Sequence, residues 1–193
     1  MTFKSFLKKI WSFIWYDNSL LSWVVNILLA FVLVKFVLYP GIGFVLGTDY
    51  PLVAVVSGSM HHEMSFDPWW DIYGPWYEER GITKEQFKEF SFKNGFNKGD
   101  IMILGGPQDL EVGDVIVYSG SPPIIHRLYA LEKDERGTYY RTKGDHNPIA
   151  DGAKIRDPPL EPFVLGKALI RIPLLGWVKI LVSDFFLKIA SFF

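Results

Sequence analysis

Residues 98–118 read KGDIMILGGPQDLEVGDVIVY, and the pattern of this stretch indicates the architecture of the domain around it. Two short apolar runs, 101–104 and 115–118, each follow a Gly-Asp pair, and Gly and Pro separate them. Short β-branched runs bounded by turn residues are typical of strands. We therefore predict two strands here, with the Gly-Asp pairs at 99–100 and 113–114 as the turns that lead into them.

Similar runs recur on both sides of this stretch. They cover residues 53–56, 124–131, 138–142 and 163–172, and Gly, Pro and Asp again separate them. Short strands at such intervals are typical of an all-β fold. The sequence therefore predicts a mainly β domain.

Segment 61–97 differs from the rest of this domain. Its residues 83–86 (Thr-Lys-Glu-Gln) fit a capping box, and Phe87 and Phe90 follow at helical spacing. Gly95 is placed to end this short helix. We interpret the segment as an insertion with a short helix in the β domain.

Residues 19–39, SLLSWVVNILLAFVLVKFVLY, contain Lys35 as their only charge. A helix of this length is about 30 Å long, which is enough to cross the core of a bilayer. Lys35 lies near one end, from where it can reach the interface, and Pro40 and Gly41 predict the end of the helix. A buried helix of a soluble protein and a cleaved signal peptide are the alternatives, and the length of the run argues against both.

The flanks of this run suggest its orientation. Residues 1–17 carry Lys4, Lys8 and Lys9 against one acid, so the positive-inside rule places the N-terminus in the cytoplasm. Apolar residues recur between these lysines at near-helical spacing, as in a helix that lies in the membrane surface. Segment 173–193 is apolar again but carries three charges, so either a membrane-associated helix or a helix packed on the domain fits it. We divide the chain into a cytoplasmic amphipathic segment 1–17, a transmembrane helix 18–40, an extracytoplasmic β domain 41–172 with the insertion 61–97, and a membrane-associated C-terminal helix 173–193.

Composition excludes several classes of site. The net charge of −1 argues against nucleic-acid binding, which requires a basic face. The absence of Cys excludes disulfides, Cys-ligated zinc, iron–sulfur clusters and a Cys nucleophile. His61, His62 and Glu63 form no H-E-x-x-H motif, and adjacent side chains chelate a metal poorly, so a zinc peptidase is a weak alternative. We expect no metal and no cofactor.

Four polar residues stand where a strand run is interrupted or ends. Ser59 lies in Ser-Gly-Ser-Met after the run 53–56, and His126 lies within the apolar run IIHRL. Asp145 belongs to a third Gly-Asp pair, but Pro148 follows it, so we place it in a loop. Asp151 lies in Ala-Asp-Gly, a turn signal. Each residue alone fits an ordinary structural role, whereas together a hydroxyl, an imidazole and a carboxylate can form a nucleophile, a base and an orienting acid.

The order of these motifs, with SGSM, KGDIMIL, VGDVIVY, IIHRL and KGDHN…D after a single spanning helix, resembles the type I signal peptidases of family S26. It is most similar to the archaeal and endoplasmic-reticulum branch, whose base is a His where the bacterial branch has a Lys. The resemblance implies that Ser59 is the nucleophile, His126 the general base and Asp151 the acid of the triad. It assigns Asp145 a supporting role and Ser57 a part in the oxyanion hole, beside the N–H of Ser59.

The resemblance also implies a fold and an activity. It implies a membrane-anchored signal-peptidase-like β domain that acts as signal peptidase I, a serine endopeptidase that cleaves secreted preproteins after small residues, as in A-x-A. The implied partners are signal-peptide-bearing preproteins, the lipid bilayer and the protein-translocation machinery, with no nucleic acid. The implied location is the plasma membrane, with the catalytic domain outside the cytoplasm. A catalytically inactive binding or scaffold protein of the same fold is the alternative.

Two features depart from the family pattern. His61-His62 stand where the family usually has Pro two residues after the Met of SGSM. The insertion contains the run PWWDIYGPWY at 68–77, too rich in Trp and Tyr for a solvated loop. These rings could form a satellite core with Phe87 and Phe90, lie in the lipid headgroup region, or bind a partner subunit. We predict that Trp69 or Trp70 reaches the membrane interface.

Overall fold

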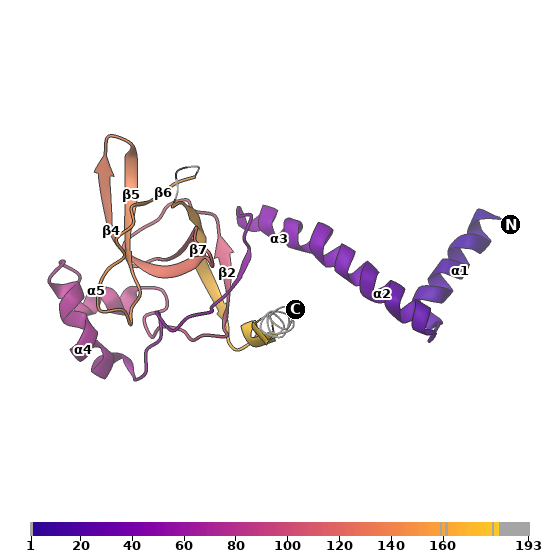
Figure 1. Cartoon of the computed structure of the whole chain (residues 1–193), viewed down its shortest axis with the longest axis horizontal. Helices are drawn as coiled ribbons and strands as arrows, with labels where there is room; N and C mark the ends of the chain where they lie inside the picture. Colours follow the sequence, from indigo (N-terminus) through magenta and orange to yellow (C-terminus); the bar gives the residue numbers. More distant parts are fainter. Residues whose placement is uncertain (1, 159, 161, 179, 182–193) are drawn as a thin grey trace, which may run out of the picture. The chain divides into compact units, whose positions relative to one another are not determined.

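The computed structural model describes residues 2–158, 160, 162–178, 180 and 181. The chain forms two compact units, Met1–Val45 and Leu46–Phe193, which we describe separately. The first unit is helical, and the second holds the β-sheet and the insertion (Figure 1).

The N-terminal unit contains the apolar helix that the sequence predicts. Its elements are α1 (Phe3–Tyr16), α2 (Leu20–Leu33), a π-helix (Val34–Leu38) and α3 (Tyr39–Leu46). From Leu20 to Leu46 the chain is one helix of 27 residues, about 40 Å long, which by length and composition can cross a membrane.

The end of this helix differs from the prediction. We expected Pro40 and Gly41 to terminate it, but it continues to Leu46. Proline has no N–H to donate, and its ring collides with the carbonyl four residues earlier in a regular α-helix. The π-helix lies just before Pro40, and within it the N–H of Tyr39 donates to the carbonyl of Val34, five residues back. This wider turn changes the spacing of the carbonyls near Pro40, so the helix can pass through it.

Polar side chains attach α1 to the start of α2. Ser22 Oγ donates to the carbonyl of Phe13 at 2.7 Å, and Asn26 Nδ2 donates to the carbonyl of Ile14 at 2.9 Å. The last carbonyls of a helix have no partner within it, so these bonds satisfy groups that lipid could not. The helix that we expected within 1–17 is α1. Its position in the membrane surface remains a prediction.

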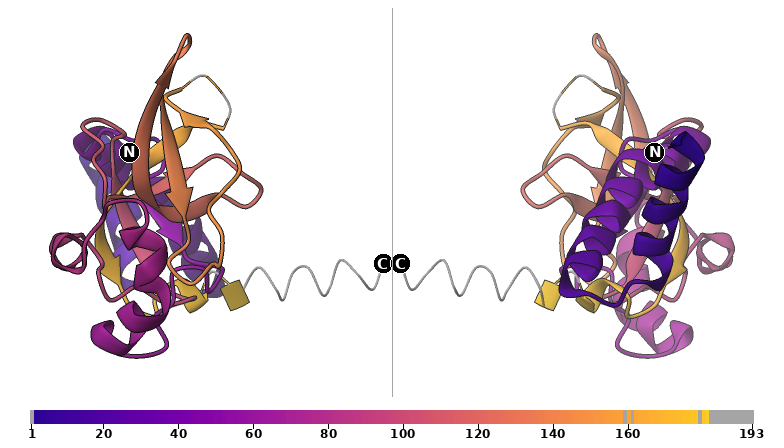
Figure 2. Two further views of the ribbon diagram at one scale, coloured as in Figure 1. Left: turned by 90° about the vertical axis from the view of Figure 1, so that its left-hand side faces the viewer. Right: turned by 90° about the vertical axis from the view of Figure 1, so that its right-hand side faces the viewer.

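The second unit is built on an antiparallel sheet in the order β1-β2-β7-β3-β4-β5-β6, which curls around its core (Figure 1). The strands are β1 (Leu52–Ala54), β2 (Ile101–Gly105), β3 (Val115–Tyr118), β4 (Ile124–Asp134), β5 (Gly137–Lys143), β6 (Ile155–Arg156) and β7 (Val164–Ile172). The hairpin of β4 and β5 projects from the rest of the sheet (Figure 2). The predicted mainly β fold is confirmed. Among the strands of the described residues, β6, which is two residues long, is the one without a signal in the sequence.

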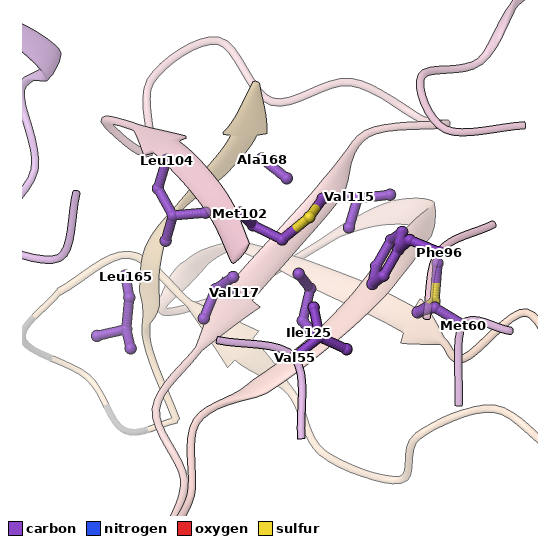
Figure 3. Packing of buried hydrophobic residues seen from close by; sticks show 10 residues of the cluster. All are labelled: Val55, Met60, Phe96, Met102, Leu104, Val115, Val117, Ile125, Leu165 and Ala168. Carbon is purple, nitrogen blue, oxygen red and sulfur yellow. The ribbon is translucent and has the colours of Figure 1, made fainter. Parts of the chain in front are cut away.

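The main core lies inside the curl of the sheet (Figure 3). It contains apolar side chains from five strands or their flanks: Val55, Met60, Phe96, Met102, Leu104, Val115, Val117, Ile125, Leu165 and Ala168. Met60 directly follows Ser59, and only 1% of its surface is exposed. The core therefore anchors the Ser-Gly-Ser-Met segment.

The first two Gly-Asp pairs form the predicted turns. Gly99 has φ of 92° and Gly113 has φ of 103°, which only glycine adopts without strain. Asp100 Oδ2 then accepts the N–H of Asn97 at 2.9 Å, and Asp114 Oδ2 accepts the N–H of Glu111 at 2.8 Å. Both carboxylates close a turn before a strand, which is a structural role.

The insertion holds two helices, α4 (Phe66–Glu78) and α5 (Lys84–Glu89). The capping box of α5 is confirmed, but α5 ends at Glu89 and not near Gly95. The sequence did not indicate α4, because Pro68, Gly74 and Pro75 suggest breaks. Pro68 is tolerated in the first turn, where its N–H has no helical partner, and Gly74 leaves room for a packed ring, since a Cβ there would lie 2.4 Å from Trp70.

The aromatic run of the insertion is a satellite core, and the prediction that Trp69 or Trp70 reaches the membrane interface is wrong. Trp69 is fully buried and Trp70 is 4% exposed. They pack with Tyr77, Ile82 and Phe87, and Phe90 lies against the same cluster. The aromatic residues of α4 recur at helical spacing, so most of them share one face of the helix. This face is buried, and Trp69 and Trp70 therefore point into the protein.

The C-terminal segment begins on the sheet domain. The N–H of Gly176 donates to the carbonyl of Gly99 at 2.8 Å, and the ring of Trp177 covers Gly99, where a Cβ would lie 2.1 Å from the indole nitrogen. Most of the C-terminal helix predicted at 173–193 lies outside the described residues, so its course stays a prediction.

Candidate active site

Ser59 lies in a tight turn between β1 and the insertion. The N–H of His61 donates to the carbonyl of Gly58 at 2.9 Å, which closes the turn. The hydroxyl oxygens of Ser57 and Ser59 are 3.1 Å apart. Val55, which precedes the turn, and Met60, which follows Ser59, are both buried in the core. They fix the backbone of the turn, which presents the hydroxyls of Ser57 and Ser59.

The loop that follows β5 lies against the backbone of Ser59. The N–H of His146 donates to the carbonyl of Ser59 at 2.8 Å, and a Cβ on Gly144 would lie 2.8 Å from the same oxygen. Asp145 N–H points at the sulfur of Met60, 3.4 Å away. The third Gly-Asp pair therefore supports the serine turn and feeds no strand, as the following Pro148 predicted.

His126 lies on β4, opposite Ile116 of β3. Its Nδ1 is 2.6 Å from Oδ2 of Asp151, and only 8% of its side chain is exposed. We assign the proton to Nδ1, as donor to the carboxylate, because that leaves Nε2 as an acceptor. The structure thus brings His126 together with Asp151 and not with Asp145.

Asp151 receives two further hydrogen bonds. Tyr118 of β3 donates its hydroxyl to Oδ2 at 3.0 Å, and Thr142 of β5 donates its own to the same oxygen at 2.6 Å. Burial acts to raise the pKa of Asp151, but the hydrogen bond and charge of His126, with the bonds from Thr142 and Tyr118, outweigh it and lower that pKa. Asp151 is therefore held as a carboxylate.

Asp145 forms a buried ion pair with Arg127, the residue next to His126. Arg127 Nε donates to Oδ1 at 2.9 Å and Nη2 donates to Oδ2 at 2.7 Å, and both side chains are fully buried. His62 Nε2 lies 3.0 Å from Oδ2, and the hydroxyl of Tyr77 donates to Oδ1 at 2.9 Å. Burial acts to raise the pKa of Asp145, but the charge of Arg127 and the bonds from His62 and Arg127 hold it well below its usual range.

The guanidinium of Arg127 has an acceptor for every N–H. Besides Asp145, it donates to the carbonyls of Ser91 at 2.7 Å, Gly113 at 2.9 Å and Phe92 at 3.0 Å. Neighbouring residues on a strand point to opposite faces, so β4 directs His126 to one side and Arg127 to the other. Arg127 therefore joins the insertion to the loop that supports Ser59. In the sequence Arg127 stood out only as the residue after His126 in IIHRL.

Lys143 is a second buried cation that the sequence analysis missed. Its Nζ donates to the carbonyls of Gly144 at 3.0 Å and Asp145 at 3.3 Å, and lies 5.0 Å from the ring centre of Trp76. Burial lowers the pKa of Lys143 to about 8, against the opposing charge of Asp145. Its only sequence signal was the repeat of Lys-Gly-Asp before a proline.

A cleft of about 260 Å³ opens beside the serine turn. It is lined by Ala54, Val56, Ser57, Ser121, Pro122, Pro123, Ile124 and Ile125. The cleft therefore runs from the end of β1 to the start of β4. One of its lining residues, Ile125, directly precedes His126. Six of the eight residues that line the cleft are apolar, which suits apolar side chains.

The residues of the zinc alternative have other contacts. His62 faces Asp145, as described above, and the ring of His61 contacts the side chain of Asn97. Glu63 is 3.9 Å from Nε2 of His146, whose Nδ1 lies 3.2 Å from the hydroxyl of Tyr73. These contacts occupy most of the ring nitrogens that a metal would need.

Comparison with known proteins gives a consistent set of relatives. The chain is 32% identical to the signal peptidase complex catalytic subunit sec11 of Schizosaccharomyces pombe over 154 residues, 76% of this chain and 75% of the relative. It is 26% identical to the subunit SEC11 of Yarrowia lipolytica over 158 residues, 78% of this chain and 73% of the relative. It is 29% identical to SEC11 of Eremothecium gossypii over 158 residues, 77% of this chain and 75% of the relative. No family model matches the sequence.

Proposed function

The chain belongs to the type I signal peptidase family, in the branch of the SEC11 catalytic subunits, and from this premise we propose that it removes N-terminal signal peptides as a membrane-bound serine endopeptidase. The observation that carries the proposal is the contact of 2.6 Å between His126 and Asp151, on the strand that leads from a small apolar cleft. In this proposal Ser59 is the nucleophile, His126 its base and Asp151 the orienting acid.

The reaction follows from these roles. Nε2 of His126 takes the proton of the Ser59 hydroxyl as its oxygen attacks the scissile carbonyl. The oxyanion is stabilised by the N–H of Ser59 and the hydroxyl of Ser57. The imidazolium, paired with Asp151, then gives its proton to the leaving amine. Water hydrolyses the acyl-enzyme in a second cycle, with His126 again as base.

Substrate recognition is proposed to use the cleft and the edge of the sheet. β1 is at one end of the strand order, so an extended peptide can add to it as a further strand. Side chains near the cut would then point toward the cleft that Ala54 and Val56 line. Small apolar residues in an A-x-A pattern fit this space.

The proposal also includes the membrane topology of the chain and its partners. We place residues 1–17 in the cytoplasm, the apolar helix Leu20–Leu46 across the cell membrane, and the β domain that follows it, with its insertion 61–97, outside. Segment 173–193 associates with the membrane. The partners are signal-peptide-bearing preproteins, lipid and the translocation machinery, and the site uses no cofactor.

Cleavage of a purified preprotein by the full chain in liposomes tests the proposed activity. We expect a single cut after a small residue, at the same rate with and without EDTA. Replacing that residue in the preprotein by Phe should reduce kcat/KM, as the proposed specificity for small residues requires. The matched control is Phe at a position outside the A-x-A pattern.

Two outcomes would contradict the proposal. Loss of cleavage in EDTA that zinc restores would favour a metallopeptidase. A folded, inserted protein that cleaves none of several preproteins would favour the inactive scaffold of the same fold.

A further inference from the structure

Three strands hold the carboxylate of Asp151. β3, β4 and β5 lie side by side in the sheet, and each contributes one donor to the same oxygen, Oδ2. The donors are Tyr118 on β3, His126 on β4 and Thr142 on β5. With a hydrogen bond to His126 alone, the carboxylate could rotate about its Cβ–Cγ bond. The hydrogen bonds from Tyr118 and Thr142 prevent this rotation.

We propose that Tyr118 and Thr142 are positioning residues for the triad acid: they fix the orientation of the Asp151 carboxylate toward His126. This inference rests on the proposed function, in which Asp151 orients His126. Neither residue touches the reacting atoms in this mechanism, so both act through Asp151.

Thr142 holds Asp151 at two points. Its carbonyl accepts the N–H of Asp151 at 2.9 Å, while its hydroxyl donates to the carboxylate at 2.6 Å. Thr142 is fully buried and Tyr118 is 3% exposed, so water does not replace these donors readily. Backbone and side chain of Asp151 are thus fixed relative to β5, the strand paired with the strand of His126.

The same donors influence where the proton resides. Each hydrogen bond to Oδ2 stabilises the carboxylate and makes it a weaker base. His126 on β4 and Tyr118 on β3 are the titratable groups that face Asp151, and the charge of Lys143, whose side chain leaves the other face of β5, acts on it from a distance. Removing a donor makes the carboxylate more basic, so it stabilises the imidazolium more strongly, and a higher pH is then needed to obtain the neutral base.

The test uses Tyr118→Phe and Thr142→Val, which remove one hydroxyl each at nearly constant shape. Thr142→Ser keeps the hydroxyl, and Tyr140→Phe is the matched control. The hydroxyl of Tyr140 donates to Asp157 at 3.0 Å in the same sheet, and Tyr140 is similarly buried at 6% exposure. kcat, KM and the pH profile of preprotein cleavage are measured for each full-length variant in liposomes.

We expect Tyr118→Phe and Thr142→Val each to lower kcat about tenfold with KM unchanged, as for the loss of one hydrogen bond to a charged group. The acid limb of their profiles should move to higher pH by about half a unit. Thr142→Ser and Tyr140→Phe should match the wild type in both respects. If Thr142→Val fails to fold, Tyr118→Phe compared with Tyr140→Phe carries the test.

The proposal is overturned if Tyr118→Phe has the kcat and acid limb of Tyr140→Phe. It is also overturned if kcat falls without a shift of the acid limb, because a purely structural role predicts that result. Absence of Ser59-dependent cleavage by the wild-type protein would instead overturn the proposed function.

Discussion

Replacing His126 by Ala is expected to slow preprotein cleavage by about 10⁴- to 10⁶-fold, the range for loss of a triad base. Ser59 would then have no acceptor for its proton. Lys143→Met is the informative comparison, since Lys is the alternative base in this family and the pKa of Lys143 is lowered to about 8. We expect Lys143→Met to retain far more activity than His126→Ala, with exposed Lys133→Met as the surface control.

The pH profile of cleavage also distinguishes His126 from Lys143 as the base. A general base must be unprotonated, so the rate falls as the pH drops through its pKa. If Lys143 were the base, the acid limb would lie near pH 8, because burial lowers the pKa of Lys143 to about that value. An acid limb near pH 8 that disappears in Lys143→Met, or equal losses in Lys143→Met and His126→Ala, would assign the base to Lys143.

Arg127→Met is expected to lower the free energy of unfolding by about 3–5 kcal/mol, because it leaves the buried carboxylate of Asp145 without its counter-charge. Asp145→Asn should be destabilising for the same reason, with Arg127 left unpaired. The control is Lys84→Met, which breaks the more exposed pair with Asp67 and should destabilise the protein much less. Chemical unfolding of the full-length variants in the same detergent measures all three.

The pH dependence of this pair has a definite sign. The pKa of Asp145 is lower in the folded protein than its ordinary value of about 3.9, so its contribution to stability is present above that value and lost as the pH falls below it. The stability of wild type should therefore fall below about pH 4, and that fall should be smaller in Asp145→Asn. If Asp145→Asn kept wild-type stability but lost activity, while Asp151→Asn cleaved normally, the two Asp residues would exchange their proposed roles.

Local pattern was sufficient to predict most of the sheet. Runs such as 101–104 and 115–118 are rich in β-branched residues and follow turns with positive-φ glycines, Gly99 and Gly113, so their local preference and their tertiary role agree. The same local logic failed at Pro40 and in α4. A π-helix lets the chain pass through Pro40 without leaving the helix. In α4, Gly74 is present because the ring of Trp70 packs against it.

The supporting residues of the site could not be predicted from the sequence, because they depend on strand register. Tyr118 ends the run VIVY and Thr142 lies in an ordinary strand, so each suggests packing. Only the order β3-β4-β5 brings their hydroxyls to Asp151. Arg127 is similar, since its partners come from the loop after β5, the insertion and the turn before β3.

The central claim is that Ser59 performs the cleavage, and the rate of preprotein processing by full-length Ser59→Ala in liposomes tests it most directly. Ser57→Ala is the matched variant, because its hydroxyl lies 3.1 Å from that of Ser59 in the same turn. The account predicts no cleavage above background for Ser59→Ala, and for Ser57→Ala a rate about 10²- to 10³-fold below wild type with the cut at the same bond. Processing by Ser59→Ala at the wild-type rate would contradict it.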